Sequence, residues 1–171
     1  MAGECKVRVG RLDESELLDL SRRCQARALP QGLRRPVRED AVRAGWVEFL
    51  SRYPLDVFFT CTFSDQYAEA HKVYNNTSAL NDFERWMKHA GLRNQYFVAS
   101  EPHFCRAVPH LHGLMESRGL PLQNLWEGWF RTRGRGRFEA PRSDAASYYC
   151  SKYSLKEANP DTIRFRLGLV R

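Results

Sequence analysis

The 171-residue sequence contains no uninterrupted apolar run longer than a few residues. A transmembrane helix needs about 20 consecutive apolar residues, so the sequence excludes a membrane span. The N-terminal segment MAGECKVRVGRLDESELLDL also has no apolar stretch of the kind that a secretory signal requires. Internal repeats and low-complexity segments are absent as well. We therefore expect a cytoplasmic protein with no membrane partner.

Cysteine is present, but not in a pattern that builds a site. The five cysteines are odd in number and include no C-x-x-C pair. Zinc knuckles and disulfide frameworks need paired or evenly numbered cysteines, so both are disfavoured. Reduced thiols in a reducing compartment account for them most simply.

The composition indicates a folded protein with an excess of positive charge. Hydrophobic residues make up 43% of the chain and charged residues 27%, close to the averages for globular proteins. The length suits one compact domain rather than two. The 27 lysines and arginines exceed the 20 acidic residues, which leaves a formal charge of +7. This excess favours a polyanionic partner such as nucleic acid or an anionic membrane surface.

The order of the predicted elements indicates an α+β fold. Helical spacing and capping signals predict helices at 13–29, 37–53, 76–91, 120–130 and 143–160. Short segments rich in β-branched and aromatic residues, or with alternating polarity, predict strands at 56–64, 95–102, 108–116 and 162–169.

The strands at 95–102 and 108–116 are close enough to pair as an antiparallel hairpin. Alternation of these elements predicts an antiparallel central sheet of about five strands with flanking helices. We divide the chain into an N-terminal helical extension, 1–52, and a core, 53–171, within one compact domain overall.

Two histidines lie one residue apart in the apolar segment VPHLHGLME. Side chains at i and i+2 of a strand point to the same face, about 7 Å apart along the chain, so His110 and His112 can converge on one small object. A hairpin would bring Glu101 beside them, with His103 as an alternative third ligand. Two imidazoles and a carboxylate suit Mg²⁺ or Mn²⁺. Taken alone, the pair is more typical of histidines whose hydrogen bonds are satisfied locally.

A second pattern lies in the predicted helix 143–160. Tyr149, Lys152, Tyr153 and Lys156 follow each other at i, i+3, i+4 and i+7, so they share one helical face. A solvated amphipathic helix can also show this pattern. A tyrosine phenol has an ordinary pKa near 10 and ionises far more readily than an alkyl alcohol, which suits a reversible covalent step on a phosphodiester.

The segments FFTCTF, PHLHGL with its upstream glutamate, and YYCSKYSLK together resemble the three motifs of the HUH endonucleases, the rolling-circle replication initiators or Rep proteins. The similarity covers about residues 56 to 156. The repeated Y-x-x-K-Y-x-x-K most resembles the two-tyrosine initiators of small single-stranded DNA phages and related plasmids. The resemblance implies the ferredoxin- or RRM-like HUH nuclease fold.

The resemblance also implies an activity: sequence-specific nicking and joining of single-stranded DNA at a replication origin, through a covalent 5′-phosphotyrosine. Tyr149 would be the first nucleophile and Tyr153 the second. His110, His112 and Glu101 would hold Mg²⁺ or Mn²⁺. Lys152 and Lys156 would stabilise phosphate charge or orient the phenols. Tyr148 faces about 100° away around the helix and could compete for this role.

The remaining partners follow from the same reading. We expect the first motif to be a structural strand, with Thr60 and Thr62 near the DNA. Four arginines spaced by glycines and a threonine could contact phosphates or lie in a solvated loop, and we favour DNA contact for Arg131, Arg133, Arg135 and Arg137. We expect Trp126, Trp129 and Phe130 to be core residues. A host or separate helicase is an expected partner, in a bacterial or archaeal cell that harbours a virus or plasmid.

Three alternatives stay open. A single-tyrosine transposase or relaxase-like strand transferase would also use His110, His112 and Tyr149. A hydrolase or transferase with a histidine nucleophile would require a third alternate histidine, but position 114 is Leu. A non-catalytic nucleic-acid-binding module would need only the basic segment and aromatic strand residues.

Overall fold

A computed structural model describes residues 36–102, 106–141 and 161–168 of the chain. The described helices are α2 (Pro36–Leu50), α3 (Asp65–His71), α4 (Asn76–His89) and α5 (Leu122–Phe130). The described strands are β1 (Val57–Phe63), β2 (Tyr96–Glu101), β3 (His110–Met115), β4 (Gly134–Glu139) and β5 (Ile163–Arg166). The predicted helices at 13–29 and 143–160 lie outside these ranges.

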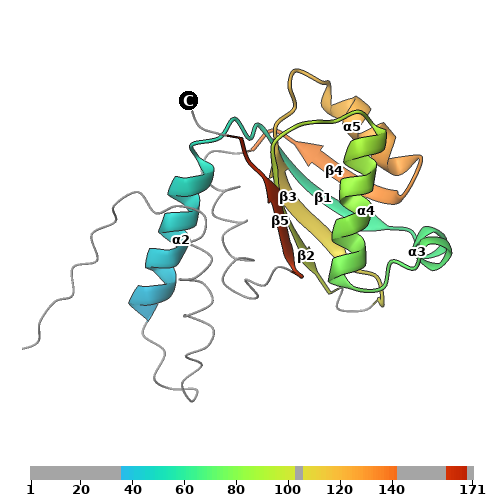
Figure 1. The fold of residues 1–171 in the computed structure, drawn as a ribbon, viewed down its shortest axis with the longest axis horizontal. Coiled ribbons are helices and arrows are strands. Elements are labelled where there is room, and N and C mark those ends of the chain that lie inside the picture. Colours follow the sequence, from blue (N-terminus) through green and yellow to red (C-terminus); the bar gives the residue numbers. More distant parts are fainter. Residues whose placement is uncertain (1–35, 103–105, 142–160, 169–171) are drawn as a thin grey trace, which may run out of the picture.

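The five strands form one antiparallel sheet in the order β4-β1-β3-β2-β5 (Figure 1). The predicted α+β class, the approximate number of strands and the antiparallel pairing of β2 with β3 are therefore confirmed. Arginine-rich residues 134–139 form the edge strand β4 rather than a solvated loop. No described helix combines the length and apolarity that crossing a lipid bilayer requires.

One face of the sheet carries the larger hydrophobic core. Residues 57, 59, 61 and 63 of β1 alternate inward and are buried, together with Leu111 and Met115 of β3. Helices α4 and α5 cover this face, with Phe83 stacked on Phe59 at 5.2 Å between ring centroids. The α4 helix begins with the capping box of Asn75 and Ser78, in which each side chain accepts a hydrogen bond from the other residue's backbone.

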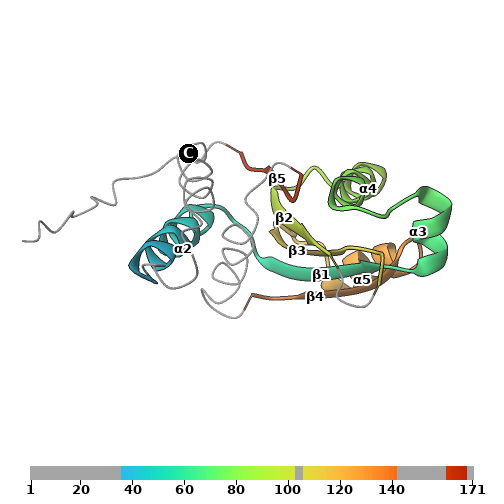
Figure 2. The same ribbon diagram turned by 90° about the horizontal axis from the view of Figure 1, so that it is seen from below.

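Helix α2 packs on part of the opposite face. Its residues Val42, Trp46, Phe49 and Leu50 recur at helical spacing and contact Phe97, Ala99, Leu114 and Ile163 of the sheet. Figure 2 shows α2 at one end of the sheet and α3 at the other. Because α2 shares a buried cluster with three strands, its packing joins the predicted extension to the core.

Helix α3 was not predicted from the sequence. It has only seven residues, which is too short for a hydrophobic period to be recognised. Its signal is instead a cap: the Ser64 side chain accepts a hydrogen bond from the backbone N–H of Tyr67 at 3.2 Å. Lys72 ends the helix in the left-handed conformation at φ 58°.

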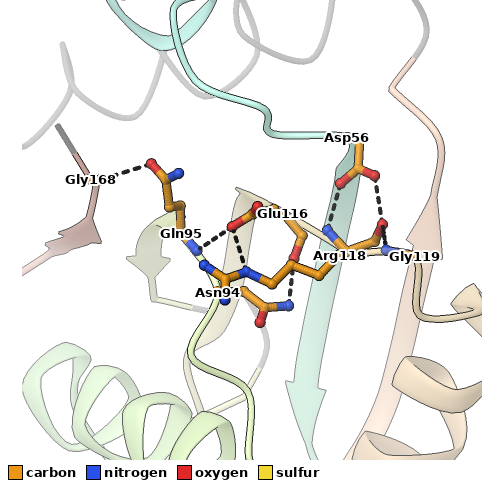
Figure 3. Close-up of polar contacts among 8 residues, drawn as sticks. Asp56, Asn94, Gln95, Glu116, Arg118, Gly119 and Gly168 are labelled. Carbon is orange, nitrogen blue, oxygen red and sulfur yellow. Dashed lines mark hydrogen bonds and ion pairs between the residues drawn. The ribbon is translucent and has the colours of Figure 1, made fainter. Parts of the chain in front are cut away.

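A polar cluster ties the strands together at the end of the sheet that holds the start of β1 and the end of β3 (Figure 3). Asp56 accepts hydrogen bonds from the backbone N–H of Ser117 at 2.6 Å and from its hydroxyl at 2.5 Å. Asn94 donates to the backbone carbonyl of Glu116 at 2.6 Å, and the Glu116 carboxylate accepts from the backbone N–H of Gln95 at 3.2 Å. These contacts hold β1, β2 and β3 in one register.

Arg133 differs from the sequence prediction. Its side chain is only 6% exposed, and its Nε donates to Asp82 of α4 at 2.6 Å. The guanidinium also lies over the rings of Tyr67 and Trp129, at 5.5 and 5.7 Å from their centroids. The predicted DNA contact by Arg133 is therefore replaced by a buried ion pair that joins the start of β4 to α4, because its position before the strand directs it inward.

Gly113 lies between the histidine pair and the core, and the sheet leaves no room for a side chain there. A Cβ atom at this position would lie 2.3 Å from the carbonyl oxygen of Phe97 and 2.5 Å from the Phe59 ring. We expect Gly113→Ala to lower the free energy of unfolding by about 1–3 kcal/mol, measured by urea denaturation. Gly128→Ala is the control, because its Cβ would meet only Trp86 at 3.7 Å. This helical substitution should stabilise the protein by about 0.5–1 kcal/mol, and equal effects would contradict the prediction.

Removing Asp82 should leave the Arg133 charge buried without its partner. We expect Asp82→Ala to lower the free energy of unfolding by about 3–5 kcal/mol in the same assay. Glu127→Ala removes the acid of the exposed ion pair with Arg131, whose side chain is 74% exposed, and should cost less than about 1 kcal/mol. A similar loss for both variants would refute a special role of the buried pair.

Candidate nucleic-acid site on the histidine face

The two predicted histidines lie side by side on one face of the sheet, where each is held by a threonine of β1. In the register of β1 and β3, Thr60 lies opposite His112 and Thr62 opposite His110. Each threonine Oγ1 is 3.1 Å from the Nδ1 atom of its histidine. The ring centroids of the histidines are 5.8 Å apart. The surface with Thr60, Thr62, His110, His112 and Glu101 is hereafter the histidine face.

These hydrogen bonds determine which imidazole nitrogen is available for other chemistry. When Nδ1 carries the proton, it donates to the threonine oxygen, and Nε2 keeps its lone pair. A hydrogen-bonded Nδ1 is the usual arrangement of histidines that bind metal ions through Nε2. The two threonines thus orient both rings through one and the same contact.

Glu101 approaches the pair from the neighbouring strand. It lies opposite His110 in the register of β2 and β3, and its Oε2 is 3.9 Å from Nε2 of His112. This distance is too long for a hydrogen bond. It is within the span of two ligands that each lie about 2.1 Å from one ion. The Glu101 carboxylate is 27% exposed and the His112 side chain 10%, so the contact lies at the edge of the buried region.

The described ranges contain no group of three or more His, Cys, Asp or Glu side chains already placed to hold a metal ion. The donor chemistry nevertheless fits Mg²⁺ or Mn²⁺, because the contacts bring one carboxylate oxygen and one imidazole nitrogen together and place a second imidazole beside them. His103, the alternative ligand, lies outside the described residues.

Two arginines extend the histidine face to the sheet edge. On β4, Arg135 lies opposite Thr62 and Arg137 opposite Thr60. Directly opposite residues share a face of the sheet, so the row Arg135–Thr62–His110–Glu101 crosses four strands. Each arginine lies about 10 Å from the corresponding histidine, from the spacing of two strands. Both are exposed; Arg137 pairs with Glu139 at 2.8 Å.

The other predicted residues have different positions. Arg131 is exposed and pairs with Glu127. Trp129 is fully buried, which confirms the core prediction for this residue. The same prediction is wrong for Phe130, which is 52% exposed and stacks on Trp126 with centroids 4.9 Å apart. Tyr149, Lys152, Tyr153, Lys156 and Tyr148 lie outside the described residues.

Three described nucleophilic groups are unsuited to attack on a phosphate. Burial raises the pKa of the Cys61 thiol well above its usual value. Burial also raises the pKa of Tyr96, as does the hydrogen bond to Glu84 at 2.8 Å. The pKa of Tyr67 is raised by burial and then by the neighbouring charge of Asp82. All three groups stay protonated near neutral pH and contribute to packing.

Comparison with known proteins gives one result. The family described as replication-associated protein ORF2 matches residues 56–158, which is more than half of the chain. No curated protein and no solved structure matches the chain. The matched segment contains the strands β1, β2 and β3, and so the histidines, their threonines and Glu101. The chain therefore belongs to the ORF2 family of replication-associated proteins, and this membership indicates a role in the initiation of DNA replication.

Proposed function

We propose that this protein is an HUH endonuclease of the two-tyrosine type, which nicks and rejoins single-stranded DNA at a replication origin. The observation that carries the proposal is the pairing of His110 and His112 with Thr62 and Thr60, with Glu101 on the adjacent strand. Orienting two imidazoles on this face of the sheet has no evident structural purpose, because the larger core is complete on the other face.

The residues have distinct roles in this proposal. His110, His112 and Glu101 hold Mg²⁺ or Mn²⁺, which supplies a Lewis acid for the oxygens of the cleaved phosphate. The threonines keep both Nε2 atoms directed to one point. Arg135 and Arg137 bind phosphates further along the strand, and Arg131 adds to the positive surface.

The proposed covalent step exchanges one phosphodiester for another. The Tyr149 phenolate oxygen attacks the phosphorus, the bond from phosphorus to the 3′ oxygen breaks, and that oxygen leaves as a 3′-hydroxyl with one proton. The 5′ end stays attached as a phosphotyrosine. Tyr153 repeats the attack at the regenerated origin, so that the first strand can be released and closed. Lys152 and Lys156 stabilise the phosphate charge or orient the phenols. A separate helicase of the host is a proposed partner.

The proposal predicts a metal-dependent covalent complex between protein and DNA. Single-stranded oligonucleotides that include the cognate origin are incubated with Mn²⁺, Mg²⁺ or EDTA, and the adduct is resolved on a denaturing gel. His110→Ala should reduce the adduct by at least about 100-fold. His89→Ala, an exposed histidine at the end of α4, is the matched control and should leave the yield unchanged.

The tyrosine variants separate the alternatives. Tyr149→Phe and Tyr153→Phe should each reduce the joining of a second oligonucleotide, with Tyr74→Phe as an exposed control. Full activity of Tyr153→Phe would favour the single-tyrosine transferase. Binding of origin DNA without any adduct, in every metal, would sink the nuclease and leave the non-catalytic binding module.

The threonines provide a test of the histidine geometry. Thr60→Val keeps the size of the side chain but removes the hydroxyl 3.1 Å from Nδ1 of His112. We expect a roughly 10- to 100-fold lower rate of adduct formation and a higher Mn²⁺ concentration at half-maximal rate. Thr77→Val, which removes a hydroxyl on α4, is the control. An unchanged metal requirement in Thr60→Val would show that this hydrogen bond does not position a metal ligand.

A further inference from the structure

A groove opens directly beside the histidine face, at the end of β1. It has a volume of about 770 Å³ and lies between α3, the end of β1 and the turn from α5 into β4. Thr62 lines this groove and also holds Nδ1 of His110 at 3.1 Å. A strand of DNA whose phosphate lies at the histidines can therefore continue into the groove without crossing another element.

The charges of the groove are arranged so that one arginine is available to a phosphate. Arg106 pairs with Asp65, and Arg131 pairs with Glu127 at 2.9 Å. Arg133 forms part of the wall but is bound to Asp82. Arg135 also lines the groove and is exposed, and within residues 36–102, 106–141 and 161–168 it makes no ion pair. Its position opposite Thr62 directs it to the same face as His110.

An exposed aromatic ring lies at the rim of the groove. Phe130 is 52% exposed although it ends an otherwise amphipathic helix, and the ring of Trp126 supports it from behind at 4.9 Å, with 13° between the planes. A large apolar ring held rigid against a second ring loses little entropy when a flat ligand stacks on it. Such platforms bind the bases of single-stranded nucleic acid independently of sequence.

We propose that this groove binds a nucleotide that flanks the cleaved phosphate in single-stranded DNA, with its base stacked on Phe130 and its phosphate on Arg135. The inference rests on the proposed function for the identity of the strand, but its binding test does not need cleavage. It also explains why α3 and the start of β4 are held together: the buried contacts of Tyr67 and Arg133 with Asp82 keep the two walls apart at a constant distance.

The test measures binding in EDTA, where no cleavage is expected. A fluorescein-labelled oligothymidylate of about 20 nucleotides is titrated with the full chain, and the anisotropy gives the dissociation constant. Phe130→Ala should weaken binding about tenfold, which is the loss of one stacked base. Arg135→Gln should weaken binding and reduce the slope of log affinity against log salt by about 0.7, the value for one phosphate of a single strand.

Two controls match these changes in chemistry. Tyr74→Ala removes another exposed aromatic, 48% exposed and outside the groove. Arg93→Gln removes an exposed arginine just before β2, at the end of the sheet away from the histidines. Both should bind within about twofold of wild type. Thermal unfolding of all four variants should coincide with wild type, since none of the four side chains is buried.

The outcomes distinguish this inference from the proposed function. Wild-type affinity in both groove variants, or an equal loss in the controls, would overturn the groove. A loss in Arg135→Gln alone would overturn the stacking platform, because a general charge effect would then suffice. Absence of a covalent adduct in wild type would sink the nuclease, whereas selective losses in both groove variants would still establish the groove as a single-strand binding site.

Discussion

The histidine face depends on the register between β1 and β3. Each residue of β3 points to the face opposite its neighbours, so Leu111 and Met115 can be buried only if His110 and His112 lie on the other side. A shift by one residue would move both imidazoles into the core and both apolar side chains into water. The bonds of Asp56 to Ser117, at the far end of the same strands, oppose such a shift.

The same register gives the site its electrostatic character. Two imidazoles and a carboxylate lie at the centre of the face, while the arginines of β4 are two strands away, at the sheet edge. A metal ion held by the central group would not be repelled by an adjacent guanidinium, and a polyanion could still contact both. Part of the chain's excess of seven positive charges thus lies where a strand of DNA would need it, and not at the proposed metal ligands.

The helices divide the remaining work. Helices α4 and α5 complete the core, and α2 covers the apolar half of the histidine face through Trp46 and Phe49. The polar half stays open beyond α2, next to α3 and the groove. Arg133 links these parts, because its pairing with Asp82 connects the turn before β4 with α4 and, through Tyr67, with α3. One buried ion pair therefore supports the groove wall and the basic edge strand together.

Local patterns in the sequence were sufficient for the strands β1, β2 and β3, for α4 and for the α+β class, because hydrophobic period, caps and turn residues act over short distances. They also selected His110, His112 and Glu101, since the i, i+2 spacing and the hairpin follow directly from strand geometry. The spacing did not separate the four arginines: Arg133 is buried, Arg131 is paired, and Arg135 and Arg137 face the site. Phe130 and α3 were likewise missed, because exposure at a helix end and a seven-residue helix leave no periodic signal. Only the tertiary structure decided these features, since burial, ion pairing and the neighbours of a side chain depend on segments that are distant in the chain.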